Sequence, residues 1–484
     1  MANNIELSEN ISAYIKQAFG NEFLEKYKEY ILSDFTIYIR MSAFVTDPKI
    51  TLENLKSYGI ETIPIENIPN AYIVKSGKEY IGKTLEFILG YYYIQSLSSM
   101  IPPIVLDPTK KDVVLDLCAA PGSKSTQLAE LMQNRGTLCV NEPNLNRVKS
   151  LMFNIDKMGF SNISAIKQKG ELLSKFFNEH FDKILVDAPC SGLGILQKKG
   201  EVSNWWNLNQ AEKIAELQFR LLVSAIKMLK PGGELVYSTC TLTIEENEIT
   251  LNKILRKYPV KLIEVNLPVN SHPAKTKYGE EELNPEIIKA HRIIPWEINS
   301  EGFFVAKLKK TESLEASKPG EVKERNIELL PANHKKIKKY ISDLSEYFGI
   351  EKSFLDLFKY QIKGHDIFVV GNDCEIGNPN VYMRIGRKFG TIDKNNIAHL
   401  HSNSIQTVAK YINKNILDIT DDSEMRIYLN GGIIKKDILP LGQKIIRYNG
   451  LIIGTAIATA GGLKSQFPRN FRTNEIILPS EIKK

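Results

Sequence analysis

The sequence predicts an α/β protein organised around a parallel sheet with helices on both faces. Between residues 101 and 310, short apolar runs alternate with stretches of helical periodicity, which is typical of such a sheet. A segment of mixed helical and extended pattern precedes this region, and short runs separated by glycines come at the end of the chain. We therefore expect an N-terminal helical and small α+β domain at 1–100, the sheet domain at 101–310, a linker at 311–326, a mixed domain at 327–424 and a small β-barrel at 425–484.

The first hundred residues predict two short helices and then a small α+β unit. Apolar residues recur at helical spacing up to about residue 33. The run Phe35–Arg40 has strand character, and a helical stretch from Thr51 to Tyr58 ends at Gly59. An aromatic-rich segment, Gly90–Met100, leads to Pro102-Pro103, which we expect to mark the start of the sheet domain.

The sheet domain is predicted from strands and helices in alternation. The expected strands are Val113–Cys118, Thr137–Glu142, Ile163–Ile166, Ile184–Val186 and Glu234–Thr239. The expected helices are Thr126–Gln133, Asn144–Met158, Leu208–Leu229 and Glu245–Tyr258. A last strand, Gly302–Leu308, is expected to run antiparallel at the end of the sheet.

The region after residue 310 begins with a charged stretch that has few apolar residues, and this composition predicts the linker. A helix at His334–Phe348 and a strand at Ile367–Val370 are expected in the mixed domain. The strands expected in the barrel are Ile427–Leu429, Lys444–Tyr448, Leu451–Ile453 and Thr455–Ala460.

The positive charge is concentrated at the C-terminal end. The chain carries a net charge of +7, and residues 426–484 hold ten Lys or Arg against three acids, a local balance of +7. The rest of the chain is thus close to neutral. A basic terminal module predicts a polyanionic partner, nucleic acid foremost, although a charged surface kept for solubility would look the same.

Cysteine usage and hydropathy predict a cytoplasmic protein. The five cysteines form no CxxC pair and are odd in number, which favours a reducing compartment over a disulfide framework. No signal peptide and no apolar run near 18 residues is present, so we expect no membrane association. No metal-ligand set is evident either, and we expect a monomer.

Two cysteines follow strand-like runs and are separated by 50 residues. Cys190 lies in Asp187–Gly192, just after Ile184–Val186, and Cys240 ends Ser238-Thr239-Cys240 after Leu235–Tyr237. Ligands of open α/β sheets bind outside the carboxyl ends of the strands. If the two strands are neighbours, both thiols project into one crevice. The alternative is that both cysteines are small buried apolar residues, as free cysteines usually are.

A loop of small residues after the first strand predicts a cofactor site. Ala119–Lys124 lets the backbone approach a ligand, and the next helix offers free N–H groups. Neither GxGxxG nor a P-loop is present. Glu142 ends the second strand, where a carboxylate can accept hydrogen bonds from ribose hydroxyls. A cofactor with a ribose and no pyrophosphate, such as S-adenosylmethionine, fits, while an ordinary turn followed by a stray acid is the alternative.

Three motifs occur in one order, Asp116–Lys124, Asp187–Gly192 and Ser238–Thr241. Together they resemble the RNA 5-methylcytosine methyltransferases of the Nop/Sun family, and Tyr91–Pro103 and Arg292–Phe304 are also similar to that family. The resemblance covers roughly residues 35 to 310. The tail, with Gly461–Lys464 followed by Phe467–Arg472, is similar to the PUA-like end of the bacterial 16S ribosomal RNA branch of the family (RsmF-like).

The resemblance implies a Rossmann-like S-adenosylmethionine-dependent methyltransferase sheet with a PUA-like β-barrel, and it implies a role for each matched residue. Cys240 would be the nucleophile, Cys190 would assist release of the product, and Asp187 would serve both catalysis and the cofactor. The implied cofactor site comprises Cys118, Ala119, Ala120, Pro121, Gly122, Ser123, Lys124, Glu142, Arg147, Lys169 and Asp187. Lys169 stands near the place where the family usually has an acid beside the adenine, so Glu171 or a backbone group would substitute there.

The chemistry explains why these residue types are needed. Carbon 5 of cytosine is a poor nucleophile, and a thiolate added at carbon 6 makes carbon 5 able to attack a methyl group. Asp187 can hydrogen-bond the N3 edge and hold a proton there. The base must leave any stack to be reached. Tyr91–Tyr93 and Trp205-Trp206 are candidates for stacking on it, although core packing is the more common use of such residues.

The sequence therefore predicts methylation of cytosine carbon 5 in RNA, foremost 16S rRNA or the small ribosomal subunit, with tRNA as the main alternative. A DNA cytosine methyltransferase would instead attack with Cys190, the Pro-Cys cysteine. A ribosome-assembly factor that binds RNA without turnover is the third hypothesis, and the intact pair of cysteines speaks against it. A protein or amine methyltransferase is disfavoured because no Asn-Pro-Pro-Tyr type motif is present.

Overall fold

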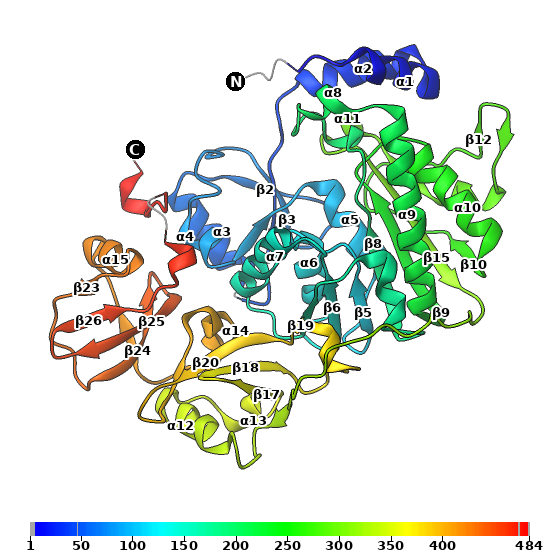
Figure 1. Ribbon diagram of the computed structural model, residues 1–484. Coiled ribbons are helices and arrows are strands. Elements are labelled where there is room, and N and C mark those ends of the chain that lie inside the picture. The colour runs from blue at the N-terminus through cyan, green and yellow to red at the C-terminus, as the bar shows by residue number, and fades with distance from the viewer. Residues whose placement is uncertain (1–4, 46, 473–474, 483–484) are drawn as a thin grey trace.

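The computed structural model describes residues 5–45, 47–472 and 475–482 of the chain. Its centre is a ten-stranded sheet in the order β11-β14-β15-β9-β8-β5-β6-β7-β19, with β10 also paired to β15 (Figure 1). The strands are β5 Val113–Asp116, β6 Thr137–Asn141, β7 Ile163–Ile166, β8 Phe181–Asp187, β9 Leu229–Thr239, β10 Val260–Ile263, β11 His272–Pro273, β14 His291–Ile293, β15 Phe303–Lys310 and β19 Tyr382–Arg384.

The middle of this sheet is parallel and is covered on both faces, as predicted. β9, β8, β5, β6 and β7 pair in parallel. Two apolar cores lie on its two sides, and each is closed by its own helices. One face carries α5 Leu97–Leu106, α6 Ser123–Leu131 and α7 Leu145–Met158, and the other carries α9 Leu208–Met228 and α10 Thr250–Lys257. The expected helix from Glu245 is interrupted, because a π-helical turn at Glu245–Ile249 precedes α10.

β15 runs antiparallel to β9, as predicted, but it does not end the sheet. β14 and β10 both pair with β15 on its other side, and β11 follows β14. These strands are two to four residues long, too short for a periodicity that would reveal them. A separate short hairpin, β12 Lys277–Tyr278 and β13 Glu281–Glu282, lies nearby.

Pro102 and Pro103 lie inside α5 and do not break the chain at a domain start. Pro103 cannot donate to the Ser99 carbonyl, and Gln95 Nε2 donates to that carbonyl at 3.1 Å instead. The helix continues to Asp107, whose φ of 48° closes it. A side chain has thus replaced the missing backbone donor.

The N-terminal residues form the two predicted helices and a small antiparallel sheet. The sheet order is β2-β3-β1-β4. The elements are α1 Glu9–Phe19, α2 Asn21–Leu32, β1 Tyr38–Met41, α3 Pro48–Ser57, β2 Thr62–Pro64, β3 Ala71–Val74, α4 Leu85–Ile88 and β4 Tyr92–Ile94. α1 and α2 share an apolar core with Leu193 and Leu242, which lie in the two cysteine loops. The helical pair therefore belongs to the central domain in space (Figure 1).

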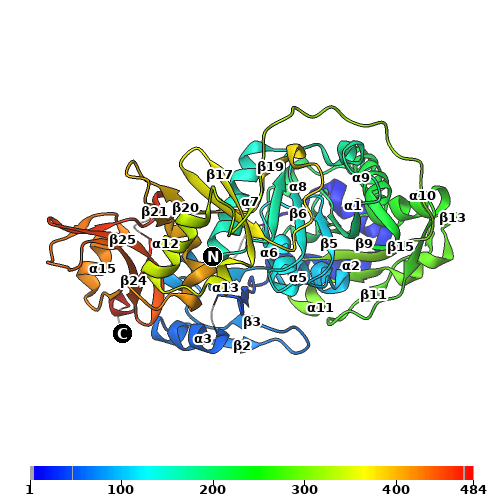
Figure 2. The same ribbon diagram turned by 90° about the horizontal axis from the view of Figure 1, so that it is seen from below.

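The C-terminal region contains two five-stranded sheets. The first comprises β16 Leu330–Pro331, β17 Phe358–Lys363, β18 Asp366–Gly371, β20 Arg387–Ile392 and β21 Ala398–Leu400, with α12 Lys338–Phe348, α13 Lys352–Leu355 and α14 Ile405–Val408. The second comprises β22 Ile416–Asp418, β23 Ile433–Ile434, β24 Gly442–Tyr448, β25 Leu451–Thr459 and β26 Gly462–Ser465, with α15 Asp422–Leu429. The linker joins β15 to β16 without a helix or strand and passes outside α9 (Figure 2).

The terminal sheet differs from the predicted PUA-like barrel in three ways. Its order, β22-β24-β25-β26-β23, is open, and no closed barrel is formed by the described residues. It begins before residue 425, because β22 pairs in parallel with β24. The expected strand Ile427–Leu429 is the end of α15, since an isolated apolar triplet does not distinguish a strand from a helix turn.

β19 links the C-terminal region to the central sheet. Tyr382 pairs antiparallel with Ile166 of β7, and the Tyr382 hydroxyl lies 3.3 Å from Cys139 Sγ. The terminal sheet in turn packs on the N-terminal unit, where Thr84 bridges to Ile477. β24, β25 and β26 lie at the opposite end of the molecule from α9 and α10 (Figures 1 and 2). No helix within the described ranges is both long and apolar enough to cross a membrane.

Candidate active site

Cys190 and Cys240 meet at the carboxyl ends of two neighbouring strands. β8 and β9 are parallel, and their register places Asp187 beside Ser238. Both chains then turn away, and the two Sγ atoms lie 2.7 Å apart. Both cysteines are free and half-buried. The expected convergence of the two thiols at one edge of the sheet is thus present.

The surroundings of Cys190 disfavour its thiolate. The hydrogen bond with Cys240 raises the pKa of Cys190 well above its ordinary range, and burial and the charges of Cys240 and Glu246 raise it further. Either sulfur can be the donor in the contact between the two cysteines.

Asp187 is held from two sides at the end of β8. Ser238 Oγ donates to Asp187 Oδ1 at 2.8 Å, and Lys124 Nζ lies 2.8 Å from Asp187 Oδ2. Burial lowers the pKa of Lys124, but the charge and hydrogen bond of Asp187 outweigh burial, so this pKa is raised. Lys124 also donates to Ser99 Oγ at 2.8 Å. The last residue of the predicted cofactor loop is thus part of the cysteine crevice.

The predicted cofactor loop follows β5 and turns into α6. Ala119 and Ala120 are buried. Gly122 has φ +109°, and a Cβ there would lie 3.1 Å from Leu151 Cδ1, so a side chain would be both strained and crowded. Pro121 precedes this glycine, and Ser123 begins α6. The loop leaves backbone groups at the carboxyl end of β5, where a ligand can approach.

Glu142 and Arg147 brace this loop. Glu142 is buried directly after β6, accepts from Asn144 N at 2.9 Å and lies 3.1 Å from Arg147 Nη1. Arg147 Nη2 also donates to the Ala120 carbonyl at 2.9 Å. Lys169, in contrast, is exposed, and within the described chain its side chain forms no hydrogen bond or ion pair. Lys169 lies three residues after β7, whose carboxyl end is at the same edge of the sheet as those of β5 and β6.

Asp116 is a site residue that the sequence reasoning did not select. It is buried, Ser125 Oγ donates to Oδ2 at 2.7 Å, and Oδ1 has no hydrogen-bond partner among the described residues. Burial raises the pKa of Asp116 to about 7. The signal available in the sequence was a carboxylate that ends the otherwise apolar run Val113–Leu115.

The acids of this edge fit the predicted cofactor. Burial raises the pKa of the Cys118 thiol well above its ordinary range, and the nearby charges of Asp116, Asp187 and Glu142 raise it further. S-adenosylmethionine carries a sulfonium, an ammonium and two ribose hydroxyls. Carboxylates stabilise the sulfonium and the ammonium and accept hydrogen bonds from the ribose hydroxyls. The three acids at this edge therefore suit S-adenosylmethionine.

Most of the aromatic residues considered for stacking pack in the protein interior. Tyr91, Tyr92 and Tyr93 are buried, as is Trp206. Trp205 is 40 % exposed and can still contact a ligand. Trp206 has a different use, because its Nε1 donates to Ser191 Oγ at 3.1 Å, next to Cys190.

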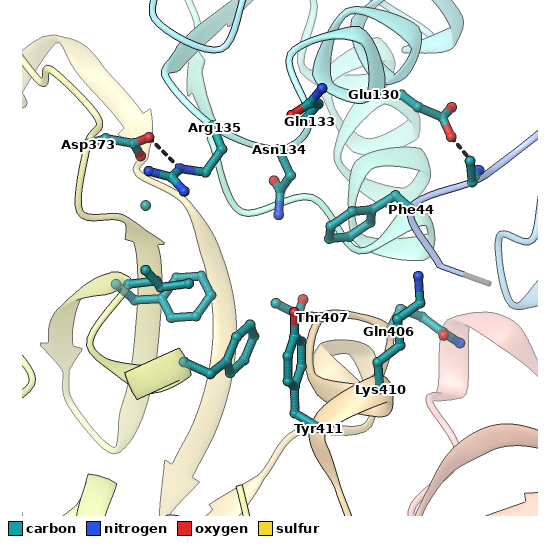
Figure 3. A pocket seen from close by; sticks show the side chains of 15 residues that line it. Phe44, Glu130, Gln133, Asn134, Arg135, Asp373, Gln406, Thr407, Lys410 and Tyr411 are labelled. Atoms are coloured by element: carbon teal, nitrogen blue, oxygen red, sulfur yellow. Dashed lines mark hydrogen bonds and ion pairs between the residues drawn. The ribbon is translucent and has the colours of Figure 1, made fainter. Parts of the chain in front are cut away.

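A cavity of about 480 Å³ is lined by side chains from three parts of the chain (Figure 3). Its lining comes from the loop after β1, the end of α6 and the first C-terminal sheet region. Phe354 and Tyr411 stack there with ring centroids 3.7 Å apart, and Arg135 pairs with Asp373 at 2.7 Å. None of the predicted site residues lines it.

Comparison with known proteins gives one family and several relatives. The family described as 16S rRNA methyltransferase RsmB/F matches residues 103–309. The ribosomal RNA small subunit methyltransferase F of Shewanella piezotolerans is 32% identical over 482 residues, which cover 96% of this chain and 98% of the relative. The tRNA (cytosine(49)-C(5))-methyltransferase of Pyrococcus abyssi is 35% identical over 276 residues, which cover 56% of this chain and 88% of the relative.

The fold also matches solved structures. A methyltransferase homolog from Pyrococcus horikoshii superposes with a TM-score of 0.56 and 30% sequence identity. The match covers 63% of this chain and 96% of that chain. The archaeal proteins thus match little more than half of this chain, whereas the Shewanella protein matches nearly all of it.

Proposed function

This chain belongs to the RsmB/F family of methyltransferases, and from that membership we propose that it methylates carbon 5 of cytosine in 16S rRNA with S-adenosylmethionine as methyl donor. The observation that carries the chemistry is the 2.7 Å separation of Cys190 and Cys240, beside the Asp187–Lys124 pair. A reaction that needed only a nucleophile would require one cysteine. Two thiols in contact suit a reaction that must both form and break a bond to the base.

Cys240 is the nucleophile of the proposed reaction. Its thiolate adds to carbon 6 of cytosine, and the electron pair of the carbon 5–carbon 6 bond becomes available at carbon 5. Asp187 hydrogen-bonds the N3 edge, and the adjacent Lys124 ammonium keeps a proton available there as charge develops. When bound, S-adenosylmethionine supplies the electrophilic methyl group that carbon 5 acquires.

Cys190 assists the release of the product. After methylation, the proton on carbon 5 is lost to solvent, the carbon 5–carbon 6 double bond reforms, and the electron pair of the carbon 6–sulfur bond returns to Cys240. A protonated Cys190 can donate a hydrogen bond to that departing sulfur, because the two Sγ atoms are in contact and its pKa is raised.

The cofactor would be held by the loop Cys118–Lys124, the acids Asp116 and Glu142, and Asp187. Arg147 would keep the loop and Glu142 in place. A role of Lys169 beside the adenine remains part of the proposal, although its side chain makes no hydrogen bond or ion pair within the described residues. The proposal also includes a cytoplasmic location and a monomeric state. The five free cysteines are consistent with a reducing compartment.

The match to the Shewanella protein favours 16S rRNA as the substrate, because it extends over both the catalytic and the C-terminal regions. Methylation of tRNA is the second candidate, since the Pyrococcus abyssi relative, named as a tRNA methyltransferase, is 35% identical over 276 residues. The test is transfer of labelled methyl from S-adenosylmethionine to free 16S rRNA, to small ribosomal subunits and to tRNA, followed by bisulfite mapping of the product.

The same assay separates the remaining alternatives. An RNA that carries 5-fluorocytosine should become linked to Cys240, whereas a link to Cys190 would indicate the DNA-type mechanism. No transfer to any of the three RNA preparations, with RNA binding intact, would indicate an assembly factor and would refute the proposal.

A further inference from the structure

Glu246 is a buried carboxylate that contacts both cysteine loops. Its Oε2 accepts from Ser191 N and from Gln218 Nε2, each at 2.9 Å. Its Oε1 accepts from Thr243 Oγ1 at 2.6 Å and from Ser191 Oγ. An ionised carboxylate offers about four acceptor positions, so all of them are used.

The residues that follow the two cysteines contact each other above this carboxylate. Ser191 Oγ and Thr241 Oγ1 lie 3.0 Å apart. Because the single hydroxyl hydrogen of Ser191 goes to Glu246, Thr241 is the donor in this pair. The chain of hydrogen bonds from the Cys240 loop therefore passes through Ser191 and ends at Glu246.

Gln218 of α9 completes the arrangement around Cys190. Its Nε2 donates to the Pro189 carbonyl at 2.8 Å and to Glu246. The residues immediately before and after Cys190 are thus both fixed, Pro189 by Gln218 and Ser191 by Glu246. The loop cannot shift without breaking several hydrogen bonds in a dry interior.

Glu246 acts through the two cysteine loops and not by contact with a bound base. It lies in the π-helical turn Glu245–Ile249, a local feature that is often found next to functional sites. Its exposure is 0 %, so the carboxylate does not reach a bound base. Burial raises the pKa of Glu246, while the hydrogen bonds from Ser191, Thr243 and Gln218 lower it in part. The hydrogen bonds of Glu246 therefore hold the two loops that carry Cys190 and Cys240 in place.

We propose that Glu246 is a positioning residue that sets the separation of Cys190 and Cys240 and thereby keeps the second thiol within reach of the first. For its consequence in turnover the inference rests on the proposed function, in which Cys190 assists release of Cys240. Loss of the carboxylate should leave addition by Cys240 possible and slow the release step.

The test compares two isosteric changes in the same turn. Glu246→Gln keeps the shape but presents an NH₂ group to donors, so it breaks contacts to Ser191, Gln218 or Thr243. Glu245→Gln is the matched control, since among the described residues the Glu245 carboxylate accepts hydrogen bonds from the hydroxyls of Tyr14 and Tyr278 and from neither cysteine loop. Ser191→Ala is a milder second variant that removes the hydroxyl and keeps the backbone N–H, should Glu246→Gln fail to fold.

Two measurements are made on each folded variant. One is the ratio of covalent protein–RNA adduct to released methylated 16S rRNA, with Cys190→Ala as the reference for accumulation. The other needs no RNA and is the rate at which diamide, a thiol oxidant, converts Cys190 and Cys240 to a disulfide, followed by mass spectrometry with Cys190→Ser as the blank.

For Glu246→Gln we expect the adduct ratio to rise and the rate of disulfide formation to fall, each by about 10- to 100-fold, the scale of a misplacement near 1 Å. Ser191→Ala should move both in the same direction by less, and Glu245→Gln should match wild type. Unchanged values of both in folded Glu246→Gln would overturn the inference. If wild type transfers no methyl but the disulfide rate still falls in Glu246→Gln, the positioning role stands and only the proposed reaction fails.

Discussion

The Sγ atoms of Cys190 and Cys240 lie 2.7 Å apart although 50 residues separate them in the chain. The contact exists because β8 and β9 are parallel neighbours, so their carboxyl ends open at the same edge of the sheet. Asp187, Lys124 and the loop after β5 meet at that edge. One edge of the sheet thereby holds two thiols in contact, an ion pair and the loop of small residues after β5.

The two cysteines should give different phenotypes when they are replaced. Cys240→Ala is expected to abolish methyl transfer, because the proposed bond to carbon 6 of cytosine forms on the Cys240 sulfur. Cys190→Ala should form the bond to RNA and fail to release it, so a covalent adduct accumulates. Labelled transfer and denaturing gels measure both. Retained activity in Cys240→Ala would refute the assignment of the two roles.

The Lys124–Asp187 pair should matter for the chemical step more than for cofactor binding. Lys124→Met removes the ammonium 2.8 Å from Asp187 Oδ2, and we expect single-turnover rates at saturating cofactor to fall by about 10²- to 10³-fold. Calorimetry should show a small change in affinity for S-adenosylmethionine. Lys149→Met, on the exposed side of α7, is the control. A large loss of affinity with a normal rate would assign Lys124 to the cofactor alone.

Asp116 should make stability depend on pH near neutrality. Its folded pKa is about 7 against an ordinary value of 3.8, so the folded state binds more protons than the unfolded state between these values. Stability is therefore lost as pH rises through 7, by at most ~4 kcal/mol. Asp116→Asn cannot ionise and should raise Tm more at about pH 8 than at about pH 5. A difference in Tm that is the same at both pH values would contradict this.

The C-terminal region should be required for the stability of the catalytic sheet. A chain that ends at residue 326 lacks β19, which covers the edge of β7, and lacks Arg384, which pairs with Asp156 at 2.6 Å. We expect Tm to fall by more than about 5 °C and the exposed β7 edge to promote aggregation. Arg384→Ala in the full chain should give a smaller shift. An unchanged Tm for the shortened chain would show that the domains are independent.

The local pattern of the chain was sufficient for the parallel sheet and for most of the site. Apolar runs such as Ile163–Ile166 and motifs such as Asp187–Gly192 are encoded by adjacent residues, so the strands and the loops at their ends could be predicted. Parallel neighbours then had to bring these loops to one edge. Ala119–Lys124, Glu142, Cys190 and Cys240 were predicted in this way, whereas the roles of Cys118, Arg147 and Asp187 were implied by the family resemblance.

Only the tertiary structure decided what depends on distant partners. Glu246 carries no sequence signal of its role, because its importance comes from burial and from hydrogen bonds to Ser191 and Gln218 on other segments. Asp116 is visible in the sequence as the acid that ends an apolar run, but only the structure shows that it is buried and that its Oδ1 has no hydrogen-bond partner among the described residues. β19 joins β7 across more than two hundred residues, and a three-residue strand has no periodicity to detect. The start of the terminal sheet before residue 425 was missed for the same reason, since β22 has three residues and pairs with β24 more than twenty residues along the chain. Local sequence fixes which backbone a segment can adopt, whereas side-chain desolvation and strand pairing are settled only when the whole chain has packed.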